Sequence, residues 1–307
     1  MRICAIPPTA SEPDRGTVLL SGFLTWGRTC CGAGEAYRGD SHPGTPRGCT
    51  GQTYPPRYAA EKGTHMTGII LAAGYATRLY PLTENFPKPL LPVGGKPILD
   101  WLIEDLRDEL DEFIAVSNHK FAGIFETWAA EKRAAGIPVR VIDDGTESNE
   151  TRLGAVKDIQ LAADGIRDDV FVMAGDNVLD FSMRPFVAFA REKGTACVMC
   201  HEENRIEKQR KTAIITLAED GRITSYEEKP REPKGNLAVP PFYIYRAEDI
   251  RRIPEALADG CGYDAPGSFA AWLSGKTAVH AWRMPGKRHD IGDLKSYEAV
   301  RDSYRGF

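Results

Sequence analysis

Short apolar runs alternate with amphipathic stretches along most of the chain from Met66 onward. The run Gly68 to Ala73 has the length and β-branched content of a buried strand, and apolar positions recur at helical spacing from Ile98 to Leu106. The same alternation predicts further strands over 113–116, 139–142, 170–174 and 196–200, and helices over 121–135, 153–163 and 186–193. Alternating strands and helices predict an α/β fold with a mostly parallel sheet covered on both faces.

The pattern changes at about Ala213, where the chain becomes rich in strands. It predicts strands over 213–217, 222–227 and 238–245, then helical stretches and a last strand over 279–282. We expect this half to add antiparallel strands and a substrate lid.

Composition narrows the class of protein. The chain has 307 residues, of which 42% are hydrophobic and 27% charged, as in ordinary globular proteins. Its formal charge of −4 makes nucleic acid and anionic membranes poor default partners. No apolar stretch reaches the roughly 18–20 residues that cross a bilayer, and the beginning lacks the layout of a secretory signal, so a cytoplasmic location is expected.

Residues 1–65 differ from the rest of the chain. They hold ten of the 30 Gly, seven of the 21 Pro and four of the seven Cys, and show no sustained period. We expect a disordered leader or an over-extended gene start, with the functional domain covering 66–307. A small metal-binding extension is the alternative. The spacings of its four cysteines match no CxxC pair, which disfavours it.

Three cysteines remain, Cys197, Cys200 and Cys261, which are too few for a zinc site of their own. Cys197 and Cys200 form a CxxC inside a predicted strand, where positions three apart point to opposite faces. We therefore predict buried free thiols.

The first predicted strand breaks into a loop that contains Gly74 and then carries Arg78 and Lys88. A residue without a Cβ permits positive φ and lets a phosphate approach the backbone amides. Arginine offers a fork of donors and lysine a compact charge, which together suit a polyphosphate. The alternative is a strand-to-helix turn with ordinary surface cations.

Asp176 and Asp290 are the candidate metal ligands. Asp176 follows a strongly apolar strand, so it should share a crevice with Gly74, because ligands bind beyond the carboxyl ends of parallel strands. A carboxylate placed there suits a hard cation such as Mg²⁺, and Asp290 in KRHDIGD is the best second carboxylate. Helix capping or turn formation is the alternative for each aspartate.

Four motifs occur in order, LAAGYATRLYPLTENFPKPLLPVGGKPILDW, AGDN at 174–177, EEKP at 227–230 and DIGD at 290–293. Together they closely resemble the sugar-1-phosphate nucleotidyltransferases, including glucose-1-phosphate thymidylyltransferases, from Met66 to the carboxyl end. The resemblance implies a Rossmann-like three-layer α/β/α fold of the nucleotide-diphospho-sugar transferase type, with a mixed, mostly parallel sheet. It also implies Mg²⁺-dependent nucleotidyl transfer from an NTP, with dTTP favoured, to a sugar 1-phosphate. Enzymes of this family are often homo-oligomers.

The resemblance assigns roles to positions of this chain. Arg78, Lys88 and Asp176 would be catalytic, and Asp176 and Asp290 would hold Mg²⁺. The nucleotide would be bound by Leu71, Ala72, Ala73, Gly74, Asn149, Leu153 and Gly154. The sugar phosphate would be bound by Gly175, Glu228 and Lys229.

The chain departs from the family pattern at three places. Ala76 stands where the first loop usually carries a second glycine, and the segment Ser148 to Leu153 does not match the base-selecting glutamine segment. Lys211 to Ala213 replaces a tyrosine-glycine pair that many thymidylyltransferases carry. The departures leave the identity of the base and of the sugar open.

Two alternative functions remain from the sequence. A cytidylyltransferase acting on phosphocholine or a similar non-sugar phosphate would need an aromatic box, which Phe242, Tyr243, Tyr245, Trp272 and Trp282 could form, although strand aromatics more often belong to a core. A nucleotide-sugar sensor without catalysis is the other. The intact set of charged residues in the four motifs disfavours the sensor.

Overall fold

The computed structural model describes residues 65–307, which belong to one compact unit. The predictions for the segment that precedes residue 65, including those for its four cysteines, lie outside the described residues.

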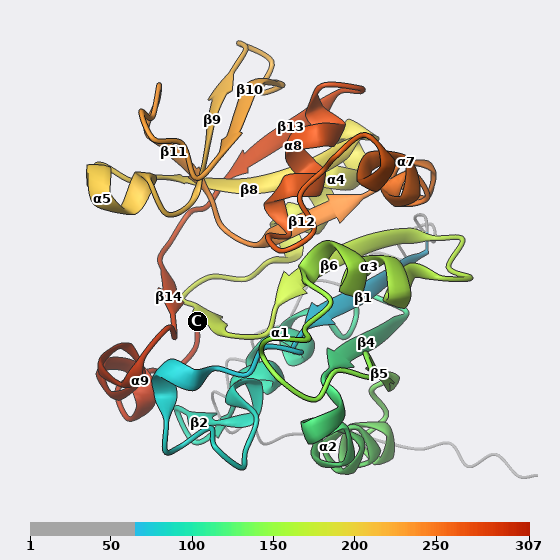
Figure 1. Cartoon of the computed structure of the whole chain (residues 1–307), viewed down its shortest axis with the longest axis vertical. Coiled ribbons are helices and arrows are strands. Elements are labelled where there is room, and N and C mark those ends of the chain that lie inside the picture. Colours follow the sequence, from blue (N-terminus) through green and yellow to red (C-terminus); the bar gives the residue numbers. More distant parts are fainter. Residues whose placement is uncertain (1–64) are drawn as a thin grey trace, which may run out of the picture. The chain divides into compact units, whose positions relative to one another are not determined.

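A ten-stranded mixed sheet organises the described chain (Figure 1). Its parallel half consists of, in spatial order, β5 (Val139–Asp143), β4 (Glu112–Ser117), β1 (Met66–Leu71) and β6 (Asp169–Ala174). Beyond β6 the neighbours pair antiparallel, in the order β12 (Phe242–Tyr245), β8 (Ala196–Glu202), β11 (Leu237–Val239), β9 (Ala213–Leu217) and β10 (Ile223–Glu228). A further strand, β13 (Val279–Arg283), pairs parallel with β8.

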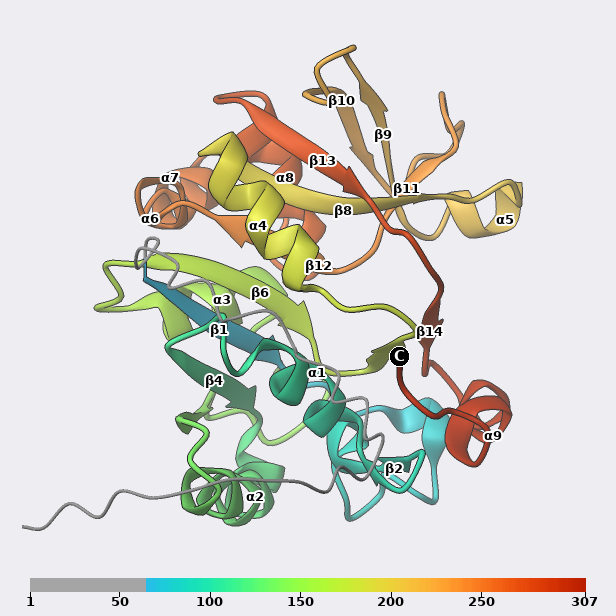
Figure 2. The ribbon, with the colours of Figure 1, turned by 180° about the vertical axis from the view of Figure 1, so that it is seen from behind.

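Helices cover both faces of this sheet, so the fold has three layers. Neighbouring residues of β1 show why, since Ile70 belongs to one apolar core and Ile69 to the other, as the two-residue period of a strand requires. The first core is closed by α1 (Ile98–Leu106), α2 (Ala122–Ala134) and α4 (Arg184–Lys193). The second core is closed by α3 (Ala155–Ala163), α6 (Ala247–Ile250), α7 (Ile253–Ala258) and α8 (Gly267–Ser274). Figure 1 shows α3, α7 and α8 on the near face of the sheet. Figure 2, the view from behind, shows α1 and α4 on the opposite face.

The predicted α/β class and the mixed sheet are confirmed, but one strand was predicted wrongly. The run 238–245 is divided into β11 and β12 at Pro240 and Pro241. Proline has no N–H to donate to a sheet ladder, so the chain turns there and β12 enters the sheet between β6 and β8. The helix predicted from Leu153 begins two residues later, after Gly154 at a φ of 94°.

The prediction for the CxxC thiols is confirmed. Cys197 and Cys200 are both fully buried and unpaired, and they belong to opposite cores of the sheet. Burial raises the pKa of Cys197 to about 12 and that of Cys200 to about 11. Both side chains therefore act as small apolar residues.

A third, smaller apolar cluster joins the two ends of the described chain. It brings Leu79 and Val93 of the first loop against Ile291 and Tyr297 near the carboxyl end. Its framework consists of the short strands β2 (Pro92–Val93), β3 (Lys96–Pro97), β7 (Asn177–Leu179) and β14 (Arg288–Asp290) with helix α9 (Leu294–Arg301). This cluster fixes the last part of the chain beside the loop that follows β1.

Within residues 65–307, no helix combines the length and the apolar character needed to cross a membrane.

Candidate active site

A cleft of about 1700 Å³ opens beyond the carboxyl ends of β1 and β6. Nine of the residues predicted from the sequence line it, namely Leu71, Ala72, Gly74, Arg78, Lys88, Asp176, Glu228, Lys229 and Asp290. They come from segments up to about 200 residues apart, which the sheet and the third apolar cluster bring to one edge.

Lys88 and Asp176 form an ion pair in this cleft. The Nζ of Lys88 donates to Oδ2 of Asp176 at 2.6 Å and to the backbone carbonyl of Ile291 at 3.0 Å. The Lys88 side chain is only 14% exposed and that of Asp176 is 29% exposed, so the pair is weakly screened by water. Lys88 lies in the short 3-10 helix Lys88–Leu90, whose Leu90 is anchored in the first core.

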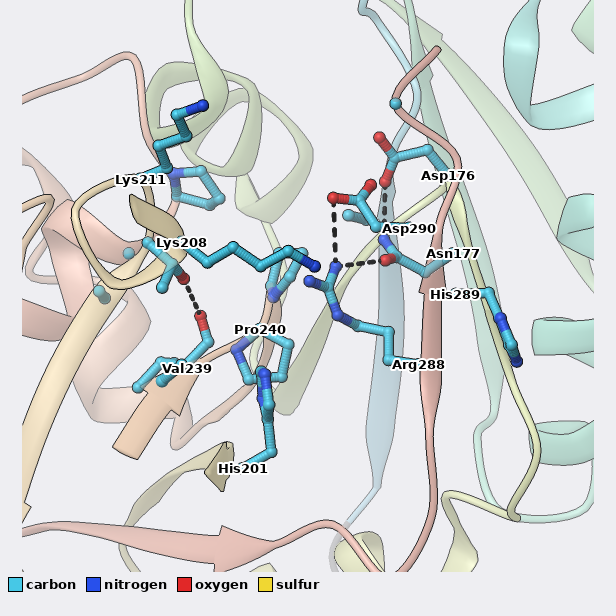
Figure 3. Close-up of a pocket in the computed structure, with 18 of the residues that line it drawn as sticks. Asp176, Asn177, His201, Lys208, Lys211, Val239, Pro240, Arg288, His289 and Asp290 are labelled. Atoms are coloured by element: carbon cyan, nitrogen blue, oxygen red, sulfur yellow. Dashed lines mark hydrogen bonds and ion pairs between the residues drawn. The ribbon is translucent and has the colours of Figure 1, made fainter. Parts of the chain in front are cut away.

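Asp290 reaches the same place because β14 pairs with β7. The register sets Asp290 opposite Asn177, and the N–H of Ile291 donates to the carbonyl of Asp176 at 3.0 Å. Arg288 donates to Oδ1 of Asn177 at 2.6 Å and lies 3.7 Å from Oδ2 of Asp290, and Asn177 in turn donates to Asp176 (Figure 3). Enclosure in the cleft and then the charge of Asp176 raise the pKa of Asp290.

This donor set fits Mg²⁺. Two carboxylates whose charges repel converge at one point, and a divalent cation between them would remove the repulsion. The described residues contain no cluster of three or more His, Cys, Asp or Glu side chains arranged to hold a metal. Mg²⁺ commonly uses one or two carboxylates and takes its other ligands from water and substrate phosphates, so Asp176 and Asp290 would suffice.

The first loop places its backbone differently from the prediction. Gly74 is exposed to the cleft with open space where a Cβ would stand, but its φ is not positive. The left-handed residue is instead Ala76, at φ 49° and ψ 39°, and its carbonyl accepts a hydrogen bond from Thr83 Oγ1 at 2.8 Å. Arg78 follows in the 3-10 turn Thr77–Leu79, which the buried Leu79 anchors.

Glu228 and Lys229 lie at the other end of the cleft, where β10 ends. Lys229 has a φ of 50°, uncommon outside glycine, and its N–H donates to Thr212 at 3.2 Å. Burial raises the pKa of Glu228. A methyl group on Gly267, the first residue of α8, would overlap with Oε2 of Glu228 and lie 2.9 Å from the Tyr226 hydroxyl. Gly267 therefore makes room for the Glu228 carboxyl group.

The family model for nucleotidyl transferases matches residues 67–305, which is most of the chain. The chain belongs to the nucleotidyl transferase family. The resemblance predicted from the four motifs is thereby confirmed, including the type of fold.

Relatives of this nucleotidyl transferase have several nucleotide specificities in their names. A UTP–glucose-1-phosphate uridylyltransferase of Haloferax volcanii is 28% identical, over 74% of this chain and 91% of its own. A UTP–glucose-1-phosphate uridylyltransferase of Synechocystis is 27% identical over 77% of this chain and 63% of its own. A glucose-1-phosphate adenylyltransferase of Fervidobacterium nodosum is 24% identical over 76% of this chain and 60% of its own. The chain thus spans less than two thirds of the length of the last two. A solved Bacillus anthracis protein assigned as a glucose-1-phosphate thymidylyltransferase, in complex with sucrose, has a TM-score of 0.67 and 25% identity over 79% of this chain and 96% of its own.

In this family member, Tyr75 connects the first loop to Thr146, which precedes the segment predicted to contact the base. Its hydroxyl donates to the carbonyl of Thr146 at 2.8 Å, and its ring is buried. The segment returns to the cleft at Ala155, whose N–H donates to the carbonyl of Asp264 at 3.3 Å. Gly154 has no room for a Cβ, because Tyr263 and Asp264 pack against it.

Five predicted residues lie near the cleft but not in its lining. Ala73 is buried in the second core and accepts a hydrogen bond from Asn118 through its carbonyl. Gly175 is buried behind Asp176, against Leu71 and Leu99. Asn149 is exposed, Leu153 is half-buried, and Gly154 is buried against Tyr263. Their assignment to the nucleotide or the sugar phosphate stays a prediction.

The aromatic side chains considered for a choline box belong mainly to the cores. Phe242, Tyr243 and Tyr245 are buried, and Trp272 and Trp282 pack half-buried against the two cores. Among these five rings only Tyr243 lines the cleft. A quaternary ammonium would therefore meet a single ring here, whereas aromatic cages use several.

The sequence did not point to Asn177, Gly267, His201 or Lys208 as individual site residues. Asn177 stands inside the AGDN motif, so its position beside Asp176 was a usable signal. Gly267 begins a helix, and His201 and Lys208 lie in or near a predicted strand, so neither periodicity nor spacing distinguishes them from structural residues. All four line the cleft.

Proposed function

We propose that this chain transfers a nucleotidyl group from a nucleoside triphosphate to a sugar 1-phosphate, giving a nucleotide sugar and pyrophosphate. The observation that carries this proposal is the convergence of Lys88, Asp176 and Asp290 at one end of a cleft whose other end holds Glu228 and Lys229. We propose residues 66–307 as the domain responsible, in line with the family match over 67–305.

The reaction needs no general base, because the attacking sugar-phosphate oxygen is already anionic. That oxygen forms a bond to the α-phosphorus while the bond from the α-phosphorus to the pyrophosphate oxygen breaks, in line, and pyrophosphate leaves with the electron pair. The protein has to bring two repelling anions together and to stabilise the charge on the transferring group. Arg78 and Lys88 would supply positive charge to the triphosphate, and Lys229 would orient the acceptor phosphate.

Mg²⁺ held by Asp176 and Asp290 would neutralise charge on the triphosphate. Glu228, whose pKa is raised by burial, would bind ring hydroxyls of the sugar. For the donor we propose dTTP, from the likeness of the motifs to thymidylyltransferases and from the Bacillus anthracis relative. The curated relatives are named for UTP and ATP, so all four triphosphates have to be compared.

The test is pyrophosphate release by the purified full-length chain with Mg²⁺, each of the four triphosphates, and a panel of sugar 1-phosphates together with phosphocholine. We expect release that requires a sugar 1-phosphate and is fastest with dTTP. Release with phosphocholine and CTP alone would favour the cytidylyltransferase. No release with any pair, from a protein that binds a nucleotide sugar, would favour a sensor.

A further inference from the structure

Three basic side chains meet at one corner of the cleft, and we call His201, Lys208 and Arg288 the basic corner. All three line the cleft, and in Figure 3 the side chain of Lys208 extends across it toward Arg288. They come from distant parts of the chain, His201 from β8, Lys208 from α5 (Ile206–Gln209) and Arg288 from β14.

The basic corner is incompletely satisfied by the protein. Across residues 65–307, Nδ1 of His201 and Nε of Arg288 are both buried without a hydrogen-bond partner. Lys208 is exposed and lines the cleft, and within residues 65–307 its ammonium has no ion pair or hydrogen bond. Burial and then the charge of Arg288 lower the pKa of His201; the charge of Glu203 raises it, and that of Lys208 lowers it.

Among the three side chains of this corner, only Arg288 has an acidic partner, Asp290. Glu203 is held by Arg205 at 2.8 Å, and Glu202 pairs with Arg283 at 3.4 Å. Asp176 is paired with Lys88, and Asp290 lies 3.7 Å from Arg288 at the metal end. Lys208 is thus an exposed, unpaired cation in the lining of a cleft whose neighbouring acids already have partners, so its ammonium is available to pair with an anionic group of a ligand.

One phosphate does not account for all of these groups. The proposed transfer already provides Lys229, Lys88 and a metal for the reacting phosphates. We propose that the basic corner binds a second acidic group of the acceptor, a carboxylate or a second phosphate on the sugar ring. The inference rests on the proposed function, because it assumes that the acceptor occupies the end of the cleft marked by Glu228 and Lys229. It also disfavours a cationic acceptor such as phosphocholine.

The test compares acceptors that differ only in the second acidic group. Calorimetric titration of the full-length protein with Mg²⁺, at one ionic strength, would use glucose 1-phosphate, glucuronic acid 1-phosphate and glucose 1,6-bisphosphate. We expect at least one of the two acidic probes to bind at least about 10-fold more tightly than glucose 1-phosphate. The probe that binds more tightly shows whether the second acidic group is a carboxylate or a phosphate.

Two variants then test whether the preference for an acidic probe depends on the basic corner. Lys208→Gln, which removes an exposed and unpaired charge and should fold, is expected to reduce the preference about 5-fold or more. Lys193→Gln at the end of α4, outside the cleft, should keep the wild-type ratio. Equal affinities for all three probes, no binding of any probe, or an undiminished preference in Lys208→Gln would each overturn the inference.

The same titrations separate this inference from the proposed function. Tight binding of an acidic probe without pyrophosphate release from any triphosphate would reject the transfer and retain the anion site. Pyrophosphate release with glucose 1-phosphate, combined with no gain from a second acidic group, would reject the anion site alone.

Discussion

Nζ of Lys88 lies 2.6 Å from Oδ2 of Asp176, although the two residues are 88 positions apart in the chain. A metal held by Asp176 and the phosphates of a substrate near Lys88 would compete for the same two groups. Binding of either would therefore redistribute the charges of this ion pair.

Removal of the lysine should mainly affect turnover. We expect Lys88→Ala to lower kcat by about 100-fold or more with a smaller change in KM, because its charge matters most when negative charge builds up at the transferring group. Lys96→Ala is the matched control, since Lys96 also pairs with a carboxylate, Glu104, in the same segment but outside the cleft. Steady-state kinetics of both variants measure the difference. An effect confined to KM would remove the proposed role of Lys88.

Removal of the carboxylate tests the metal assignment. Asp176→Ala should lose turnover by a factor of about 100 or more and should no longer respond to added Mg²⁺, because the proposed site would keep only one carboxylate. Asp108→Ala is a suitable control, because the Asp108 side chain is 70% exposed on the surface. A titration of the rate with Mg²⁺ distinguishes the two variants. Near-normal activity of Asp176→Ala would overturn the assignment.

Gly267 offers a test of the acceptor end of the cleft. The methyl group of Gly267→Ala would overlap with the tip of the Glu228 side chain and lie 2.9 Å from the buried Tyr226 hydroxyl, so both side chains have to move. We therefore expect a lower Tm than that of the wild type and, well below that Tm, a KM for the acceptor raised about 10-fold, as the carboxyl group leaves its position. Gly123→Ala in α2 adds the same methyl group where there is open space, and its KM should not change. An unchanged KM in Gly267→Ala would argue against Glu228 as an acceptor ligand.

Ala76 carries backbone strain in the first loop. An L-residue other than glycine in the left-handed region costs about 1 kcal/mol, so Ala76→Gly should stabilise the protein by up to that amount. The same substitution at the exposed Ala130 inside α2 should destabilise by about 1 kcal/mol, because glycine is a poor helix former. Urea unfolding of both variants measures the change in the free energy of unfolding, which should be positive for Ala76→Gly and negative for Ala130→Gly. Destabilisation by Ala76→Gly would show that the strain is compensated elsewhere.

Asp158 makes stability depend on pH. It is buried on α3, its Oδ1 has no hydrogen-bond partner among residues 65–307, and burial together with the charge of Asp144 raises its pKa to about 7. The unfolded chain releases this proton near pH 4 and the folded protein near pH 7, so the folded state binds more protons between these values. The contribution of Asp158 to stability therefore falls as the pH rises from about 4 to 7, and it stays low above 7.

Asp158→Asn removes the ionisable group and with it the loss of stability that accompanies deprotonation of the buried carboxyl group. Its stability relative to the wild type should rise with pH, with a gain at pH 8 of roughly 2–4 kcal/mol over the difference at pH 4. Asp164→Asn, an exposed aspartate at the end of the same helix, should show no such trend. Urea unfolding of the three proteins at pH 4 and pH 8 measures this gain. A constant difference between Asp158→Asn and the wild type would contradict the assignment.

Much of this protein could be predicted from local patterns. The strand before Gly74, the helix from Ile98 to Leu106 and the opposite faces of Cys197 and Cys200 all follow from the period of apolar positions, which depends only on neighbouring residues. The order of the four motifs was enough to indicate the family, which the match over 67–305 confirmed.

The assembly of the cleft had no local signal. No pattern in the sequence says that β12 enters the sheet between β6 and β8, or that β14 pairs with β7 and sets Asp290 opposite Asn177. Such pairings are chosen by the packing of the whole chain, since hydrogen bonds between strands are available to any extended segment. The sequence by itself therefore determined the elements, the family and most of the charged groups. Only the tertiary structure decided which of those groups face one another, because that depends on contacts between residues far apart in the chain, such as Lys88 and Asp176, which are 88 positions apart.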